Sequence, residues 1–329
     1  MLIEQLQAGL EARVSLGEAL ASEGTDCFRL FHGAAEGLPG LTVDRYGPLI
    51  LVQDSRQVVS DALWGEVLRP WLATAIPDAP HQVLNRRGKH AKGRAPAPAT
   101  PEALEDHEGR ELGLRYRVRA RHRGQDPLLF LDLRAGRRWV QAEAEGLSVL
   151  NVFAYTCGVG VVAAAGGARE VWNVDFASSS LDVGDENAVL NGVGMTRVQD
   201  DALLVMRQLA GLPIKGRAAR KRYTKRPARA FDLVVLDPPR WARSRFGAVD
   251  VERDYPTLFK PAVLAARPGG RVLATNHLAW VALEDWLGVL ERCARKAGRP
   301  LKGIEVLEVE PDFPSFDGRS PLKLAVCQV

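Results

Sequence analysis

The sequence predicts an α/β protein in which a doubly wound domain with a parallel sheet follows a smaller α+β domain. Two observations carry this prediction. From about Leu128, apolar runs of strand length alternate with helical stretches, a pattern typical of a parallel sheet covered on both faces. Before about residue 125, short strand-like runs follow one another between turn residues such as Pro39-Gly40.

The N-terminal residues 1–24 predict one amphipathic helix, because leucines recur at helical spacing with charged residues between them. Residues 25–125 are assigned to the small α+β domain, which is expected to bind RNA and recognise the substrate. Its expected strands and helix lie at 27–33, 41–47, 49–54 and 81–87, and at 63–73 for the helix.

Residues 126–329 are assigned to the doubly wound domain. Its strands are expected at continuous apolar runs that end in turn or polar residues. Its helices are expected where apolar residues recur at helical spacing. The expected strands are 147–154, 170–176, 231–239 and 269–276, and the expected helices are 178–192, 255–266 and 281–297.

Composition limits the classes of protein. The 329 residues are 46% hydrophobic, enough for ordinary cores, and no run approaches the roughly 18 apolar residues of a membrane span. The N-terminus does not read as a signal peptide, so we expect a cytoplasmic protein with no membrane partner. The four cysteines lack paired spacing, so neither a disulfide framework nor a metal site is predicted. The oligomeric state is open, with a homodimer among the possibilities.

Positive charge is concentrated in a few segments. The net charge is +4, yet "PIKGRAARKRYTKRPAR" (213–229), which includes Lys221 and Arg222, carries eight Lys or Arg and no acid, leaving 4 − 8 = −4 elsewhere. A second basic segment is "RRGKHAKGR" (86–94). Such clusters are typical of a phosphate-backbone partner, although a basic loop can also be simply solvated.

"RYRVRARHR" (115–123) places arginine at every second position. Side chains alternate along a strand, so an extended conformation puts all five guanidinium groups on one face. That face is a candidate surface for nucleic-acid phosphates, unless the arginines pair with acids of the protein itself. The five are Arg115, Arg117, Arg119, Arg121 and Arg123.

Two motifs of the second domain indicate nucleoside binding. "YTCGVGVVAAAGG" follows the first strand, with Gly158 and Gly160 at the turn, and fits the G-x-G-x-x-[GA] pattern of dinucleotide sites. Asp175 ends the next strand, 15 residues past Gly160, where a carboxylate can bind ribose hydroxyls. NAD and S-adenosylmethionine both carry that ribose. Tight glycine turns also occur in folds that bind nothing.

The motif "LDPPRW" (236–241) favours one of these two ligands over the other. Asp237 ends a core strand, where open α/β sheets place ligand-binding groups, and Pro238 and Pro239 stiffen the chain that follows. Asp-Pro can simply terminate a strand. Beside the glycine turn and Asp175, however, Asp-Pro-Pro favours a methyltransferase acting on nucleobases over a dehydrogenase.

Three long segments, "LFLDLRAGRR" (129–138), the stretch from 149 to 192 and "FDLVVLDPPRWARSR" (231–245), together resemble the bacterial 23S rRNA large-subunit methyltransferase family. The segment 28–53 is similar to the small α+β domain that precedes catalysis in that family. The resemblance implies a Rossmann-like class I methyltransferase domain, S-adenosylmethionine as cofactor and ribosomal RNA of the large subunit, or its precursor, as partner. The family's usual N-terminal RNA-binding module is expected to be absent.

The resemblance also implies roles for individual residues. Asp237 would face the methyl group and the target base, and Asp175 the ribose of the cofactor. Asp201 matches the acid that contacts the adenine amino group, with Asp200 as the alternative register. The remaining implied cofactor residues are Asp132, Arg134 and Arg137 of D-x-R-x-x-R, and Phe153, Tyr155, Gly158 and Gly160 near the methionine end.

The segment "VLATNHLAW" (272–280) departs from the cytosine-modifying relatives, in which a cysteine follows the fifth core strand. Methylation of cytosine carbon 5 needs such a nucleophile. Asn276 and His277 are closer to the "SNN" of relatives that modify guanine nitrogen 7, although His277 can also be an ordinary polar residue at a strand end. Trp241 and Trp280 are candidates to stack on an unstacked base, or are packing residues.

The sequence therefore predicts an S-adenosylmethionine-dependent rRNA methyltransferase that favours guanine N7. Cytosine carbon 5 is the alternative target. A non-catalytic RNA-binding assembly factor that retains the fold is the alternative from another class, and a methyltransferase for small molecules or proteins is a further one.

Overall fold

A computed structural model of the chain describes residues 2–87, 100–122, 126–214, 219–244 and 247–329. The chain divides into two compact units. The first contains Met1–Asp132 and Glu310–Arg319, and the second contains Leu133–Val309 and Ser320–Val329. The segment 310–319, which the sequence analysis left in the second domain, joins the first unit because the buried Asp312 carboxylate accepts the backbone N–H of Arg29 at 2.8 Å.

The N-terminal segment forms two helices, α1 (Leu2–Glu11) and α2 (Val14–Ser22), where the sequence predicted one. The break falls at Arg13, whose guanidinium donates to the Gly9 carbonyl at 3.1 Å and to the Glu36 carboxylate at 2.5 Å. Glu36 lies beyond the first strand, so the interaction joins residues far apart in the sequence. The helical spacing of the leucines continues across Arg13 and therefore gives no sign of the break.

A four-stranded sheet forms the core of the first unit. Its order is β1-β2-β3-β4, with antiparallel pairs except for the parallel pair β3/β4. The expected helix begins as a π-helix (Leu63–Leu68) and continues as α3 (Arg69–Ala75). The strands match the expected ones: β1 (Cys27–His32), β2 (Leu41–Tyr46), β3 (Leu49–Asp54) and β4 (His81–Arg86).

A short helical turn and a hairpin follow in the same unit. The 3-10 helix η2 covers Pro101–Leu104, and β5 (His107–Glu111) pairs antiparallel with β6 (Leu114–Val118). The 3-10 turn η3 (Leu131–Leu133) then leads into the second unit.

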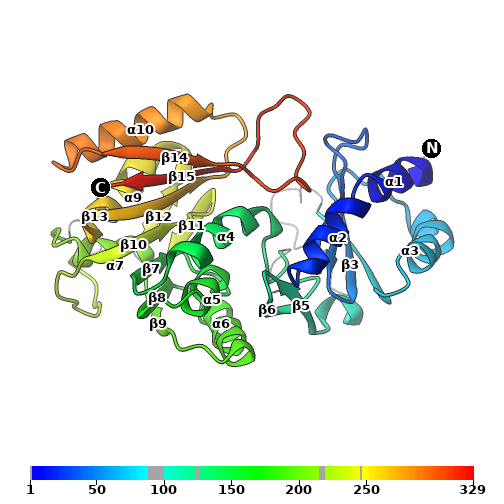
Figure 1. Cartoon of the computed structure of the whole chain (residues 1–329), viewed down its shortest axis with the longest axis horizontal. Coiled ribbons are helices and arrows are strands. Elements are labelled where there is room, and N and C mark those ends of the chain that lie inside the picture. Colours follow the sequence, from blue (N-terminus) through cyan, green and yellow to red (C-terminus); the bar gives the residue numbers. More distant parts are fainter. Residues whose placement is uncertain (1, 88–99, 123–125, 215–218, 245–246) are drawn as a thin grey trace. The chain divides into compact units, whose positions relative to one another are not determined.

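The second unit is built on a seven-stranded sheet of order β14-β15-β13-β10-β7-β8-β9 (Figure 1). Strands β9, β8, β7, β10 and β13 pair in parallel, whereas β15 pairs antiparallel with both of its neighbours, β13 and β14. The strands are β7 (Ser148–Val152), β8 (Glu170–Asp175), β9 (Thr196–Gln199), β10 (Phe231–Leu236), β13 (Ala266–Asn276), β14 (Gly303–Leu307) and β15 (Lys323–Gln328).

Helices cover both faces of this sheet, as the sequence predicted (Figure 1). On one face α4 (Arg134–Glu143), α5 (Gly158–Ala165) and α6 (Ser178–Asn191) pack in series. On the other, α7 (Ala202–Leu209), α9 (Val251–Ala265) and α10 (Leu283–Lys296) share one apolar core with the sheet. A small hairpin, β11 (Trp241–Ser244) with β12 (Gly247–Asp250), follows β10.

The order of the strands fixes where a ligand binds. The chain runs from β7 outward through β8 to β9, then returns to β10 on the other side of β7. The carboxyl ends of β7 and β10 therefore flank the point at which the winding reverses, and open α/β sheets bind ligands there. Among the described helices, none is both long and apolar enough to cross a membrane.

Candidate active site

The strand register brings the predicted site residues into one row. Val152, Val174, Leu236 and Ala274 are side by side on neighbouring strands. The next residue along each strand therefore stands at the same carboxyl edge of the sheet. These residues are Phe153, Asp175, Asp237 and Thr275, three of which the sequence analysis selected.

The loop after β7 has an unusual backbone. Phe153, Tyr155 and Cys157 all adopt left-handed conformations, with φ of 60°, 48° and 60°. A non-glycine residue in this region costs about 1 to 3 kcal/mol and persists only where its surroundings fix it. The alternation turns Phe153 and Tyr155 to partly exposed positions while Cys157 is buried. Strain of this kind concentrates at ligand sites, which supports the predicted role of Phe153 and Tyr155.

Asp175 holds this loop in place. Its carboxylate accepts the backbone N–H of Tyr155 and of Ala177, both at 2.9 Å. Burial raises the pKa of Asp175 above its ordinary value, and the two backbone donors partly oppose that shift. A carboxylate oxygen accepts more than one hydrogen bond, so Asp175 retains the capacity to accept ribose hydroxyls.

Helix α6 packs against this loop and supports it, which the sequence analysis did not predict. The Asn187 side chain donates to the Thr156 carbonyl at 3.0 Å, and a Cβ added to Gly184 would lie 2.4 Å from the Cys157 sulfur. Asn191 instead donates to the Asn187 carbonyl at 2.8 Å, within its own helix. Asn187 of α6 therefore supports the cofactor loop, whereas Asn191 does so only through its own helix.

The two glycines of the turn differ in their surroundings. Gly158 opens α5 and is partly exposed, whereas Gly160 is buried. A Cβ at Gly160 would lie 2.2 Å from the Asn173 side-chain oxygen, so this glycine permits α5 to pack closely on β8. Glycine at the third position of the dinucleotide fingerprint has the same packing role.

Asp237 is the centre of a polar cluster at the end of β10. Its Oδ1 accepts the Thr275 hydroxyl at 2.5 Å and lies 2.8 Å from His277 Nε2. Burial opposes ionisation of Asp237, but the charge and hydrogen bond of His277, the Thr275 hydroxyl and the charge of Arg137 outweigh it. The pKa of Asp237 is therefore held below its ordinary value, and the residue is a carboxylate at neutral pH.

The D-x-R-x-x-R segment divides between the units. Asp132 lies in η3 of the first unit, while Arg134 and Arg137 lie in the first turns of α4. Both arginines are almost fully buried, at 0% and 2% exposure. Arg137 acts electrostatically on Asp237, so it belongs to the surroundings of the predicted site.

Aromatic side chains are exposed next to Asp237 and His277 in the sequence. Trp241 is 58% exposed and Trp280 is 55% exposed. The Arg240 guanidinium stacks on the Trp280 ring, 4.6 Å from its centroid. Pro238 is buried and Pro239 is exposed, so the chain turns outward between them. Exposed aromatic rings are suited to stacking on a base.

Asn276 is placed differently from the expectation that it reads a base edge. It is only 3% exposed, and its side-chain oxygen accepts the Leu278 backbone N–H at 2.8 Å. This bond shapes the turn after β13 and presents His277, which is 31% exposed. Direct contact of Asn276 with a base stays a prediction.

The two candidate acids after β9 have different surroundings. Asp201 caps α7 by accepting the Leu204 N–H at 2.8 Å and is partly exposed. Asp200 is buried and pairs with Arg226 at 2.7 Å. Asp201 is therefore the more accessible of the two for an adenine amino group, and its role stays a prediction.

The arginines of β6 lie on one face, opposite the buried Tyr116 and Val118, and continue to Arg121. Acids of the same unit pair with arginines of this face, since Glu108 binds Arg115 and Asp106 binds Arg119. Arg123, residues 88–94 and residues 215–218 lie outside the described residues. In the basic segment 213–229, Lys221 and Arg222 are exposed, and Arg229 pairs with Glu170.

The reversed winding, the strained loop, Asp175 and Asp237 are together the features expected of a Rossmann-like methyltransferase that uses S-adenosylmethionine. Residues 29–328 match the family of S-adenosylmethionine-dependent methyltransferases, and the chain belongs to that family. It is 31% identical to a ribosomal RNA large subunit methyltransferase of Deinococcus radiodurans, over 99% of this chain and 78% of that protein. It is 29% identical to ribosomal RNA large subunit methyltransferase I of Aeromonas hydrophila, over 95% and 75%.

Solved structures agree on the fold. The methyltransferase SMU.776, crystallised as a complex with SAH, superposes with a TM-score of 0.77 at 22% identity, over 99% of this chain and 80% of that one. A SAM-dependent methyltransferase from Streptococcus mutans gives a TM-score of 0.75 at 21% identity, with the same coverage. These likenesses confirm the predicted fold class, and the family match over residues 29–328 confirms the enzyme class and the cofactor.

Proposed function

We propose that this enzyme methylates a base of 23S ribosomal RNA and that its favoured target is N7 of a guanine. The curated relatives in Deinococcus radiodurans and Aeromonas hydrophila carry names that specify ribosomal RNA of the large subunit. The choice of base atom is carried by one observation, the burial of all four cysteine thiols.

All four cysteines are buried, and burial raises the pKa of each thiol, that of Cys327 to about 12. Methyl transfer to cytosine carbon 5 requires a thiolate that adds to the ring and later leaves. Cys157, which belongs to the cofactor loop, is 3% exposed and packs against Gly184. Buried protonated thiols favour a target that needs no covalent intermediate.

A guanine N7 already has a lone pair, so its methylation needs orientation and electrostatic stabilisation. S-adenosylmethionine supplies an electrophilic methyl group on a positively charged sulfur. As the nitrogen attacks, the base gains positive charge and loses no proton. The Asp237 carboxylate, ionised at neutral pH, stabilises that charge, and His277 and Thr275 fix its orientation.

The exposed tryptophans complete the proposed base site. An unstacked nucleotide loses stacking energy of a few kcal/mol, which aromatic contacts in the enzyme offset. Trp241 and Trp280 supply such rings, and Arg240 over Trp280 adds a planar cation that also contacts phosphate or base.

The test is mass-spectrometric mapping of methylated nucleosides in 23S rRNA from cells with and without the protein. We expect the loss of one 7-methylguanosine, its return with the wild-type gene, and no return with the D237N variant. Loss of a 5-methylcytidine instead would overturn the argument from the thiols. An unchanged set of rRNA nucleosides would overturn the assignment of rRNA as substrate.

A further inference from the structure

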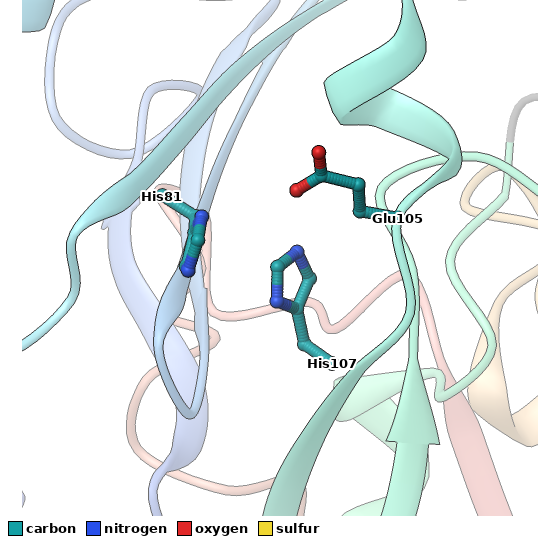
Figure 2. A group of neighbouring side chains, drawn as sticks. All are labelled: His81, Glu105 and His107. Atoms are coloured by element: carbon teal, nitrogen blue, oxygen red, sulfur yellow. The ribbon is translucent and has the colours of Figure 1, made fainter.

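A group of nitrogen and oxygen donors lies in the first unit, in residues that the proposed methyl transfer does not use. His81 begins β4, Glu105 follows η2 and His107 begins β5. One side-chain donor atom from each residue lies within 4.8 Å of the other two. Figure 2 shows the three side chains converging from two separate segments of the chain.

The backbone fixes the origin of each side chain. The His81 N–H donates to the Pro48 carbonyl at 3.1 Å, which holds the start of β4 beside β3. Glu105 is the residue that caps η2, and His107 is paired with Val118 of the hairpin. Because Glu105 and His107 are two positions apart in extended chain, their side chains leave the backbone on the same side.

The two imidazole rings are close enough to share a ligand. Their centroids are 4.4 Å apart with an interplanar angle of 42°. The His107 Nε2 atom is shielded from solvent and has no hydrogen-bond partner among the described residues. Buried polar atoms are nearly always satisfied, so an orphaned nitrogen beside a second imidazole and a carboxylate points to a missing ligand.

We propose that His81, Glu105 and His107 form a binding site for a divalent transition-metal ion of the Zn²⁺ type. Two imidazoles and one carboxylate are a donor set that suits Zn²⁺ and its neighbours, whereas Mg²⁺ and Ca²⁺ prefer oxygen donors alone. A tetrahedral ion with bonds of about 2.0 to 2.1 Å places its donors roughly 3.3 Å apart. His81 and Glu105 are exposed, so we expect their side chains to rotate to that spacing when an ion binds.

The chemistry of His107 is compatible with this role. A neutral imidazole binds metal through the lone pair of its unprotonated nitrogen, and the shielded His107 Nε2 is that nitrogen in the tautomer that carries the proton on Nδ1. The bound ion would connect β4 to the start of the β5–β6 hairpin and so stabilise the first unit by mass action.

The test uses untagged full-length protein freed of metal with a chelator, because a histidine tag would bind the ion itself. Zn²⁺ is titrated by calorimetry, and Co²⁺ by its visible absorption, which reports tetrahedral nitrogen and oxygen ligation. We expect one ion per chain, a raised Tm with Zn²⁺ and no Tm change with Mg²⁺. The variants H81A and E105Q should each weaken Zn²⁺ binding by about tenfold or more.

Glu102→Gln is the matched control, since Glu102 is an exposed acid three positions before Glu105 and outside the donor group. This variant should bind Zn²⁺ like the wild type. Because His81 and Glu105 are exposed, both test variants should fold, which circular dichroism verifies. Absence of Zn²⁺ binding at micromolar ion, or equal binding in H81A and the wild type, would overturn the proposal. Methyl transfer need not change in either case.

Discussion

At the scale of single residues, Asp237 is the most constrained group of the site. It accepts hydrogen bonds from Thr275 and His277 and is only 20% exposed. A carboxylate with two such partners keeps one orientation, and preorganised charge of this kind stabilises a transition state at little cost of reorganisation. Asp237 is therefore the residue at which a change of one atom should be most damaging.

We predict that the D237N variant folds normally but transfers methyl groups about 100-fold more slowly or worse, because it removes the negative charge and one acceptor. The measurement is the initial rate of methyl incorporation into 23S rRNA lacking the modification. The control variant is E252Q, which makes the same acid-to-amide change at an exposed residue of α9 and should retain the wild-type rate. A D237N rate within a factor of a few of the wild type would contradict the proposed role.

The sequence was sufficient to predict which acidic residues lie at the site. It was not sufficient to predict which side chains they bond to. Asp175 and Asp237 were found because each ends an apolar strand, a signal local to its own segment. Thr275 was missed, because its contact with Asp237 comes from the pairing of β10 with β13. The burial of Asn276 depends on a turn that residue types alone do not specify.

At the scale of elements, the cofactor loop depends on α6. Cys157 occupies the space above Gly184, while Asn187 holds the Thr156 carbonyl. A loop with three left-handed non-glycine residues is strained, so it needs this external support. Small displacements of α6 should therefore affect cofactor binding.

We predict that Gly184→Ala destabilises the protein by about 1 to 3 kcal/mol, because its methyl group would lie 2.4 Å from the Cys157 sulfur. Cofactor affinity should fall as well, since the loop and α6 must separate. Isothermal titration with S-adenosylmethionine and urea denaturation measure the two effects. The control is Gly194→Ala, where an added Cβ meets nothing within 4 Å. Equal affinity in both variants would show that α6 does not support the loop.

The opposite, amino-terminal edge of the sheet is fixed by a buried acid. Asp232 at the start of β10 accepts the backbone N–H and the hydroxyl of Ser148 of β7, at 2.8 and 2.7 Å, and pairs with Arg169 and Arg267. Burial opposes its ionisation, but the Ser148 donors and the two arginines outweigh it. The pKa of Asp232 is therefore lowered.

We predict that the D232N variant loses about 1.5 to 3 kcal/mol of unfolding free energy at pH 7. Because the folded pKa is below the unfolded one, this contribution is complete above about pH 4 and disappears as the pH falls through the folded value. The difference from wild type, measured by urea denaturation, should thus shrink in acid. The exposed pair of Asp182 with Arg197 provides the D182N control, which should lose at most about 1 kcal/mol. A pH-independent difference would contradict this account.

Element boundaries were predictable where the signal was local. The strands β1 to β4, β7, β8, β10 and β13, together with α6, lie within a few residues of where apolar runs and helical periods predicted them. The division of the N-terminal helix was not, because it depends on Arg13 bonding to Glu36. The group of His81, Glu105 and His107 was also missed, since its members come from distant segments without a motif spacing.

At the scale of the whole molecule, the acidic side chains of the candidate site and the arginine face proposed to bind RNA belong to different units. The carboxylates Asp175 and Asp237 lie at the sheet edge of the second unit, and the arginine face of β6 lies in the first unit. Arg115 and Arg119 already have acidic partners. Exposed ion pairs of this type contribute only about 0 to 1 kcal/mol, so RNA phosphates can replace the carboxylates. The ion pairs with Glu108 and Asp106 are therefore compatible with the proposed binding of RNA by the arginine face.

The last prediction tests this role with the R117Q/R119Q/R121Q triple variant. Each phosphate contact releases counterions, so removing three contacts should flatten the slope of log affinity against log salt by about 2 to 3 units. RNA affinity should fall while S-adenosylmethionine affinity stays unchanged. Filter binding of 23S rRNA fragments at several salt concentrations measures the slope. The R292Q/R295Q/K296Q variant removes the same charge from exposed positions of α10. If both triple variants flatten the slope equally, general charge attracts the RNA, and the arginine face of β6 has no specific part in binding.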